Sequence, residues 1–355
     1  PQNNLLLSSS PHAYSKIDTR KIMLAVIIAL LPTTVYGVVL YGAHALLVIL
    51  VSVGSAVLFE YLFRLITRQD IRIDDFSAVV TGLLLALILP PSTPLWAAAM
   101  GSFAAIVFAK EFFGGLGANP FNPALIGRAI LLMSFPQRIG GTWHIPFKAL
   151  TDATTTATPL TILKLGGTIT DAAVTSGATS MTNLSNTVGS VGASLVEQGV
   201  ASNTDYSTIL NVLFLGNRAG CIGESSILLI LIGFAFLLLV RVIDWIVPVC
   251  MVGSAFVLSY ILGADPVFAI LAGGLVFGAV FMATDYSSSA LTVKGKVIFG
   301  IGAGAMTIII RQFGGYPEGV TYGILLMNAV TPFLDKLRTK KYGYVKPAKT
   351  GGARS

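Results

Sequence analysis

The segment TDATTTATPL carries the hydroxyl groups of this chain that are best placed for chemistry. Asp152, Thr155, Ala157 and Thr158 follow the spacing D-x-x-[ST]-x-A-[ST]. A threonine hydroxyl can be esterified, and Pro159 favours extended backbone at Thr158, which would present that hydroxyl to a modifying enzyme. The alternative is an ordinary polar loop that is rich in threonine.

The spacing resembles the site at which a flavin transferase joins the phosphate of FMN to a threonine hydroxyl. No standard side chain carries a hydride or a single electron well, so an anchored flavin would give redox chemistry to a membrane protein. A second string, Thr175–Ser180, contains Ser-Gly-Ala-Thr, but Ala173 stands six residues before Thr179, where the pattern requires Asp. We therefore predict Thr158, with Asp152 six residues before it, as the covalent attachment site.

The composition is that of an integral membrane protein. Of 355 residues, 54% are apolar and 11% are charged, and the mean hydropathy is +0.80, whereas about a quarter of residues are charged in soluble domains. Two cysteines, Cys221 and Cys250, cannot supply the four thiolates of an iron–sulfur cluster, and His12, His44 and His144 form no ligand spacing. Any redox group of this chain is therefore expected to be organic or shared with another subunit.

Ten apolar segments are long enough, or nearly so, to cross a bilayer core of about 30 Å. The polar N-terminal stretch leads into the first segment without a small-residue cleavage pattern, so we predict a retained helix rather than a cleaved signal peptide. We predict an all-α polytopic fold in which Gly and Pro break several helices. The segments are 22–41, 43–61, 76–91, 94–112, 121–135, 224–241, 243–262, 266–284, 296–312 and 319–335.

Basic residues divide unequally between the two sides of these segments. Cytoplasmic flanks collect Lys and Arg, so the richer side, which includes both termini, is predicted to be cytoplasmic. Residues 136–215 then lie outside the cytoplasm. The net charge of +7 is explained by this topology, and no nucleic-acid partner is required.

Five segments on each side of the long polar stretch predict an inverted duplication, because two tandem five-helix units enter the membrane in opposite senses. Two broken segments support it, since Ser77–Pro91 ends at Pro-Pro and Phe268–Asp285 at Thr-Asp. The alternative is that any two glycine-rich membrane helices look alike. The predicted organisation is an N-terminal arm, a first five-helix repeat, a polar loop with the attachment site, a second repeat and a basic tail, at residues 1–21, 22–135, 136–215, 216–335 and 336–355.

Two further motifs could contact a ligand. In GANPFNPA, two Asn-Pro steps around Phe121 are expected to hold Asn119 and Asn122 in extended backbone, with amides free for a ligand or a neighbouring helix; a tight turn would need the same residues. In GNRAGCIGESS, Gly220 and Gly223 would allow the backbone to approach a planar or phosphorylated ligand closely.

Two carboxylates stand at predicted membrane boundaries. Glu224 precedes the sixth segment and is either a charge at a helix N-terminus or a group near a ligand or cation. Asp285 follows the eighth segment in ATDYSSSALT. It is either a plain interfacial charge or a group for ion passage or cofactor hydrogen bonding.

The motifs, taken in order, resemble the D-type membrane subunit of the Rnf ion-translocating oxidoreductase, a family related to the B-type subunit of the sodium-translocating NADH:quinone reductase. They are SPHAY, DFSAVVTGLLLALILPPS, GANPFNPA, DATTTATPL, GNRAGCIGESS and FMATDYSSSALT. The resemblance covers nearly the whole chain, and the short N-terminal arm favours the Rnf protein. One departure is FMATDYSSSA, because relatives read more like TDPVTSP and this chain lacks the proline.

The resemblance implies an electron relay that couples electron flow between ferredoxin and NAD to sodium or proton movement. FMN would be esterified to Thr158 on the outer side and exchange electrons with a flavinylated neighbouring subunit, and noncovalent riboflavin would sit among the helices. Other subunits would bind NAD and ferredoxin, in agreement with the lack of a dinucleotide fingerprint here. The chain would be matured by a flavin transferase, contact membrane lipid and span the cytoplasmic (inner) membrane of a bacterium or archaeon.

A secondary transporter or channel would show the same helices, repeats and breaks. The flavin-attachment pattern separates the two hypotheses, because a carrier has no need of a flavin. A subunit of a sodium-translocating NADH:quinone reductase is the other alternative.

Overall fold

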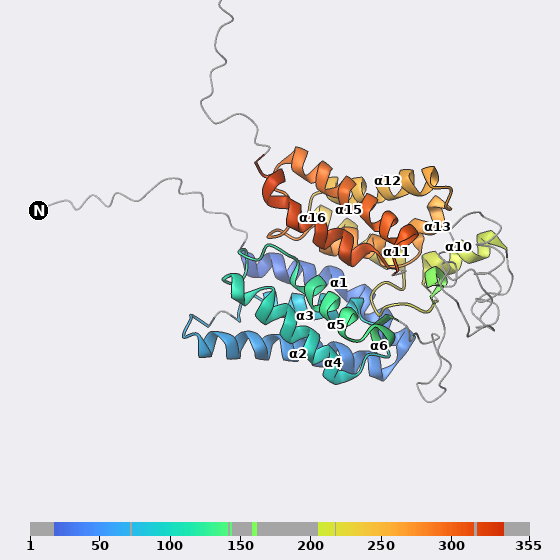
Figure 1. Cartoon of the computed structure of the whole chain (residues 1–355). Coiled ribbons are helices and arrows are strands. Elements are labelled where there is room, and N and C mark those ends of the chain that lie inside the picture. The colour runs from blue at the N-terminus through green and yellow to red at the C-terminus, as the bar shows by residue number, and fades with distance from the viewer. Residues whose placement is uncertain are drawn as a thin grey trace, which may run out of the picture.

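The described residues form helices joined by turns, and none of them belongs to a β-strand. In this computed structural model they are 18–71, 73–140, 143, 158–161, 205–216, 218–315 and 318–336. Figure 1 shows two groups of helices lying side by side, one from the first half of the chain and one from the second. We name the two ends of this bundle the Asp285 end, where the first helix begins, and the Thr158 end.

Described residues of the range 18–140 form six α-helices. They are α1 (Thr19–Tyr41), α2 (Ala43–Ile66), α3 (Ser77–Ile88), α4 (Leu95–Phe103), α5 (Pro123–Ser134) and α6 (Pro136–Gly140). A π-helical segment, Ala104–Phe108, and a 3₁₀ turn, Glu111–Phe113, follow α4. Asn122 starts α5, because its Oδ1 accepts hydrogen bonds from two backbone N–H groups of the first turn and Pro123 supplies the first helical φ angle.

The second half begins with α10 and contains a broken helix. Its elements are α10 (Tyr206–Leu215), α11 (Ile227–Leu239), α12 (Ile246–Ile261), α13 (Pro266–Leu271), α14 (Leu275–Phe277), a π-helical segment (Gly278–Met282), α15 (Val293–Phe313) and α16 (Val320–Leu334). Ala272 is extended and Gly273 has a φ of +69°, so the chain leaves α13 before it turns into α14. A side chain with a Cβ would strain that backbone.

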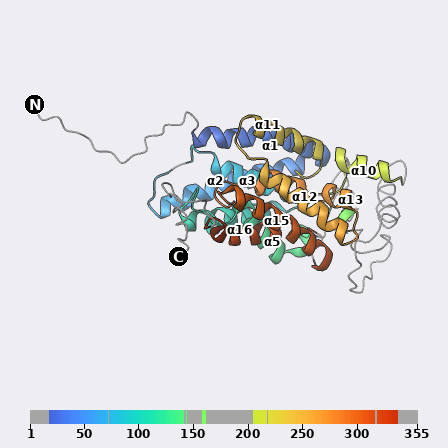
Figure 2. The same cartoon turned by 90° about the horizontal axis from the view of Figure 1, so that it is seen from above.

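The two halves meet along α1 with α11 and along α5 with α16. Figure 2 shows α1 and α11 side by side from above. Within the halves, α2 packs on α3 and α4, and α12 packs in the same order on α13 and α15. These relations agree with an inverted duplication, which stays a prediction.

Each of the ten predicted segments contains a helix, and one region differs from the prediction. The segment 266–284, predicted as one of the broken segments, is interrupted between α13 and α14 and continues as a π-helix. The region 136–215, expected as a polar loop, includes α6 and α10. Helix α10 forms because its apolar residues Ile209 and Leu213 share one face and are buried.

In the described part of the chain, four helical stretches are long and apolar enough to cross a membrane by themselves: Thr19–Tyr41, Ala43–Ile66, Leu95–Phe113 and Val293–Phe313. Six others are apolar but shorter, including α3, in which all residues but one are buried. A short helix is tolerated at membrane depth when protein surrounds its ends, because neighbouring groups then satisfy the backbone. The described chain is thus an all-α polytopic membrane protein with broken helices.

Candidate functional site

Thr158 opens a short helical turn at the Thr158 end of the bundle. Its Oγ1 accepts a hydrogen bond from the N–H of Thr161 at 3.2 Å and lies 2.8 Å from the Thr161 Oγ1. Pro159 is the first helical residue after it. Thr158 is 5% exposed, so its hydroxyl is engaged inside the protein rather than presented as the sequence predicts. This difference arises because the hydroxyl caps the turn.

The remaining residues of the predicted attachment pattern lie outside the described part of the chain. These are Asp152, Thr155 and Ala157, together with Ala173 and Thr179 of the second string.

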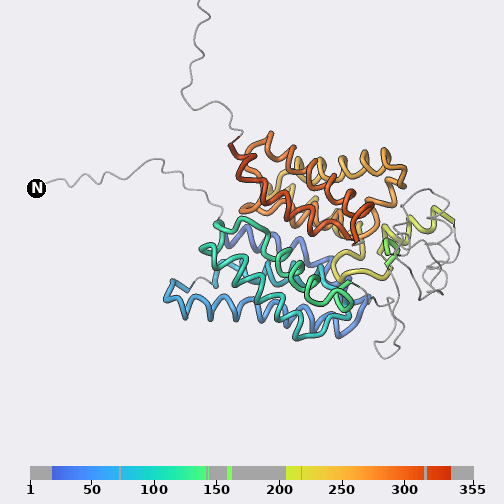
Figure 3. The backbone as a smooth tube through the Cα atoms, viewed as in Figure 1, coloured from blue at the N-terminus to red at the C-terminus, as the bar shows by residue number. Residues whose placement is uncertain are grey.

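Leu160 fixes the Thr158 turn to the bundle. It is buried in an apolar cluster with Ile209 and Leu213 of α10 and with Phe268 and Ala272 at the broken helix. Figure 3 shows the short green turn beside the yellow α10, at the end opposite the start of α1. The turn therefore has a defined position relative to the break between α13 and α14.

A buried group of charges lies at the Thr158 end, between the two halves. Arg128 of α5 places its Nη1 3.4 Å from the Glu224 Oε1, and its Nη2 pairs with Glu318. The same Nη2 is 3.5 Å from the Cys221 sulfur. Arg218 donates to the backbone oxygen of Glu224 at 3.1 Å. We name these five residues, together with Arg311, the Thr158-end charge cluster.

Glu224 is buried and ion-paired, so it is not a solvated charge at the start of α11. The Glu224 carboxylate lies beside Gly274 at the start of α14, in space that a side chain at position 274 would occupy. Ligand atoms of Cys221, Glu224 and Glu318 lie within 4.8 Å of one another, a separation that a metal ion could use. Arg128 contacts all three groups, so its guanidinium already supplies positive charge there.

The glycines of GNRAGCIGESS have different surroundings. Gly223 donates to the backbone oxygen of Leu87 at 2.7 Å, and a Cβ at Gly223 would lie 2.6 Å from the Leu87 Cβ. The close approach predicted for Gly223 is therefore made to α3. A Cβ at Gly220 would meet open space, so Gly220 lacks a packing requirement of this kind.

Arg311 of α15 completes the Thr158-end charge cluster. It is 1% exposed, and it donates to the backbone oxygens of Ala269 at 2.6 Å and Ala272 at 3.2 Å. These carbonyls have lost helical partners because α13 ends there. Arg311 is a charge at the end of an apolar segment, which is the sequence signal for a site residue, but the sequence prediction uses it only for topology.

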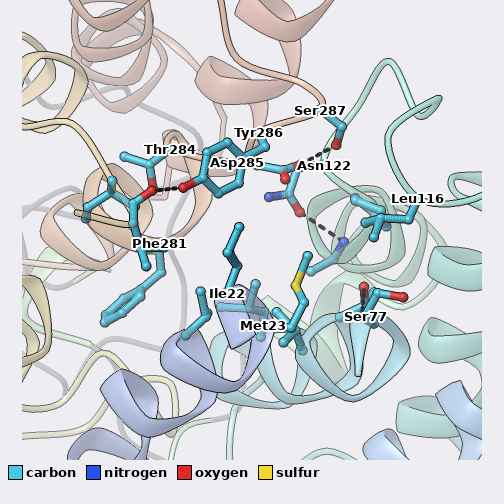
Figure 4. Close-up of a pocket in the computed structure, with 18 of the residues that line it drawn as sticks. Ile22, Met23, Ser77, Leu116, Asn122, Phe281, Thr284, Asp285, Tyr286 and Ser287 are labelled. Atoms are coloured by element: carbon cyan, nitrogen blue, oxygen red, sulfur yellow. Dashed lines mark hydrogen bonds between the residues drawn. The ribbon is translucent and has the colours of Figure 1, made fainter. Parts of the chain in front are cut away.

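A cavity of about 80 Å³ lies at the Asp285 end, between the two halves. Figure 4 shows Asn122 and Asp285 toward one side of this cavity and Ile22 and Met23 of α1 toward another. Lys110 and Asn119 also line it. The structure thus brings together residues from α1, from the GANPFNPA motif and from the loop after the broken helix.

Both predicted asparagines have partners within the protein. Asn122 donates from its Nδ2 to the backbone oxygen of Met282 at 3.2 Å while its Oδ1 caps α5. Asn119 donates to the backbone oxygen of Phe121 at 3.0 Å. The turn alternative therefore has structural support, although both side chains border the cavity.

Asp285 accepts hydrogen bonds from two hydroxyl groups of its own loop. The Ser288 Oγ donates to the Asp285 Oδ2 at 2.9 Å and the Ser287 Oγ at 3.1 Å. Burial raises the pKa of Asp285, and these serine hydrogen bonds oppose the rise because they favour the charged form.

A second buried charge network, missed by the sequence prediction, adjoins the cavity. Lys110 places its Nζ 2.8 Å from Glu60 and 2.6 Å from the Ser77 Oγ. Arg64 lies 2.9 Å from Glu60 and 3.2 Å from Glu111. The network is formally neutral, with two acids and two bases. Glu60 and Lys110 could have been singled out, because charges inside apolar segments are costly unless paired.

The fold and these polar centres define a polytopic membrane protein with buried charges at both ends of its bundle. Residues 6–343 match the NQR2, RnfD, RnfE family, and the chain belongs to that family.

Curated relatives match over nearly their whole length. The D-type subunit of the proton-translocating ferredoxin:NAD(+) oxidoreductase complex of Clostridium ljungdahlii is 43% identical, with 99% of this chain and 98% of the relative covered. The D-type subunit of the Na(+)-translocating ferredoxin:NAD(+) oxidoreductase complex of Acetobacterium woodii is 41% identical, with 99% of each covered. The D-type subunit of the ion-translocating oxidoreductase complex of Stutzerimonas stutzeri is 39% identical, with 93% of each covered.

Proposed function

We propose that this chain is the D-type membrane subunit of an ion-translocating ferredoxin:NAD oxidoreductase complex in the cytoplasmic membrane. Similarity along nearly the whole chain to two relatives of that name carries the proposal. The partners are then the other subunits of the complex, including a flavinylated neighbour, and NAD and ferredoxin bind elsewhere in it. One relative is named for protons and the other for sodium at nearly equal identity, so either ion agrees with the similarity.

FMN is held in this proposal by an ester between the Thr158 Oγ1 and the flavin phosphate, formed by a flavin transferase. The group supplies reversible electron uptake, which side chains lack. Thr158 fits as the anchor if its turn opens, because the hydroxyl must leave Thr161 to bond phosphorus. The two hydrogen bonds to Thr161 contribute about 1 kcal/mol each to the closed turn, and the burial of Leu160 stabilises it further.

We also propose that riboflavin, a second flavin that is not covalently attached, binds in the cavity at the Asp285 end. Asn122, Asp285 and Lys110 offer polar groups, and Met23 and Phe281 offer apolar surface. The cavity volume of 80 Å³ is smaller than the roughly 150 Å³ that admits benzene in an engineered protein core. Binding of a three-ring flavin therefore requires flexible side chains such as Met23 to move.

Electron transfer is coupled in this proposal to translocation of sodium or protons. Asp285 and Glu224 are carboxylates near opposite ends of the bundle, and each is held by neighbours that could exchange for a cation or proton. Their positions support a role for this chain in ion movement.

Fluorescence of the denatured protein band tests the flavin site. Thr158→Ala is expected to abolish in-gel flavin fluorescence, because no oxygen remains to form the ester. Thr179→Ala is the matched control and is expected to keep it. Loss of fluorescence in Thr179→Ala alone would move the site to the second string, and a dark wild-type band would overturn the flavin proposal.

A further inference from the structure

The Thr158-end charge cluster carries more positive than negative charge among the described residues. Its three arginines are Arg128, Arg218 and Arg311, and its two carboxylates are Glu224 and Glu318. A cysteine thiol is ordinarily neutral at about pH 7, so Cys221 adds no negative charge. One formal positive charge is therefore left over. In the described part of the chain, Arg311 has only backbone oxygens as hydrogen-bond partners.

This excess charge is buried. The exposed fractions of Arg128, Arg218 and Arg311 are 5%, 3% and 1%. An unbalanced cation in a low-dielectric setting is unfavourable, and it interacts strongly with any negative charge brought near it. The Nε atoms of Arg128 and Arg311 also lack a hydrogen-bond partner among the described residues. The cluster is thus suited to stabilise an added negative charge.

The turn that begins at Thr158 packs close to Arg311 of this cluster. Leu160 and Arg311 pack on the same glycine of the broken helix, Gly273. A Cβ atom added to Gly273 would lie 3.0 Å from the Arg311 Nη2 and 3.5 Å from the Leu160 Cδ2. A group attached two residues before Leu160 is therefore near the buried positive charge.

We propose that the Thr158-end charge cluster, and Arg311 in particular, raises the electron affinity of the flavin anchored at Thr158. The flavin gains one negative charge when it accepts one electron without a proton, and the buried guanidinium stabilises that charge. Arg311 acts here through its electric field, without direct contact with the reacting atoms of the flavin. The inference rests on the proposed attachment of FMN to Thr158.

A redox titration of the full chain, purified with its covalent flavin, tests the inference. Dithionite supplies the electrons, and the spectrum of the Thr158→Ala protein is subtracted. Arg311→Gln is expected to disfavour one-electron uptake about tenfold, a shift of ~59 mV to more negative potential. Arg311→Lys keeps the charge and is expected to stay near wild type. Arg68→Gln, which changes an exposed arginine at the Asp285 end, should have no effect.

Glu318→Gln makes the test independent of the stability of Arg311 variants. It removes a negative charge from the cluster, so the potential is expected to move in the opposite direction, to less negative values. A general loosening of the fold would not produce shifts of opposite sign. The inference would be overturned by unchanged potentials in both Arg311→Gln and Glu318→Gln, or by a more negative potential in Glu318→Gln. The proposed function would still stand in that case if the denatured wild-type band is fluorescent and the Thr158→Ala band is not. A dark wild-type band would remove both.

Discussion

Arg128 is the residue on which the Thr158-end charge cluster depends most. Its guanidinium pairs with both Glu224 and Glu318, and in the sequence Glu224 precedes α11 whereas Glu318 follows it. Removing one partner of a buried ion pair costs more than the pair contributes, because the remaining charge stays desolvated. Loss of Arg128 would leave two carboxylates in that state.

Arg128→Gln is therefore expected to lower the free energy of unfolding by about 3–5 kcal/mol. The measurement is thermal unfolding of the detergent-solubilised protein. Arg68→Gln serves as the control at an exposed position and should change stability by no more than about 0.5 kcal/mol.

The double variant Arg128→Gln, Glu318→Gln checks the reason for that loss. It should be less destabilised than the sum of the single variants, because Glu318 no longer leaves an unpaired charge. Strict additivity would show that the two side chains do not interact.

Asp285 gives stability a defined dependence on pH. Because burial raises its pKa, the folded protein holds this proton more tightly than the unfolded chain does. The stability that Asp285 contributes is present below its ordinary pKa of 3.8 and is lost as the pH rises through the raised value. Asp285→Asn keeps an oxygen for Ser287 and Ser288 but cannot ionise.

Asp285→Asn should consequently unfold at a higher temperature than wild type above the raised pKa, and the difference should shrink as the pH falls towards 3.8. Unfolding temperatures measured across this range provide the check. Ser288→Ala is a useful comparison, since loss of a hydrogen bond to the charged form should raise the pKa of Asp285 further. A difference between wild type and Asp285→Asn that is constant with pH would contradict this explanation.

Individual polar residues were predictable where they interrupt an apolar pattern. Glu224 and Asp285 stand at the edges of apolar segments, so each could be chosen from the sequence alone. Their environments were not predictable. Arg128 contacts Glu224 across 96 positions of the chain, and no local pattern specifies such a pairing. The hydrogen bonds of Thr158 to Thr161 were likewise not predictable, because the sequence does not distinguish a threonine whose hydroxyl caps a turn from one whose hydroxyl is free to react.

At the scale of elements, hydrophobicity located the helices, and glycine and proline indicated that some of them are broken, but the sequence did not show what stabilises a break. The segment 266–284 is apolar throughout its centre, yet Gly273 and Gly274 let the backbone leave the helix there. The break persists because Arg311 from α15 satisfies carbonyls of Ala269 and Ala272. That partner comes from a different helix, so a scan of segment 266–284 alone could not show it.

Close contact between α1 and α11 leads to a prediction about how the halves join. A Cβ at Gly233 would lie 2.5 Å from the backbone oxygen of Ala29 and 3.0 Å from Phe281. Small residues permit such backbone approach between membrane helices. Gly233→Ala should therefore reduce stability by about 1–3 kcal/mol through overpacking.

Gly54→Ala is the matched control for Gly233→Ala. Gly54 lies inside α2 and is exposed, and a Cβ added there would have no neighbouring atom within 4 Å. Alanine favours helix by up to about 1 kcal/mol over glycine, so this change should be neutral or stabilising. Equal decreases in the unfolding temperature of the two variants would indicate that the contact between the halves does not control the result.

For the whole molecule, the distribution of basic residues predicts that the Asp285 end faces the cytoplasm. The structure supplies exposed positions at both ends, Thr67 after α2 and Ser207 in α10. In a background without Cys221 and Cys250, an impermeant thiol reagent on intact cells should label Ser207→Cys and leave Thr67→Cys unreacted. Disrupted cells provide the control, because both positions should then react. Labelling of Thr67→Cys alone on intact cells would invert the orientation.

In the proposed function, coupling between electrons and ions would be a property of the complete complex. An electron that reaches a flavin near buried charges changes the local field, and in a low-dielectric setting that field alters the affinity of carboxylates for a cation or proton. Thr158→Ala removes the anchor without adding or removing charge in the protein. In vesicles that contain the whole complex, this variant is expected to lose ferredoxin-dependent NAD reduction and the accompanying ion uptake together. Fast, unchanged ion uptake under an imposed gradient, with electron transfer abolished, would show that ions move independently of the flavin.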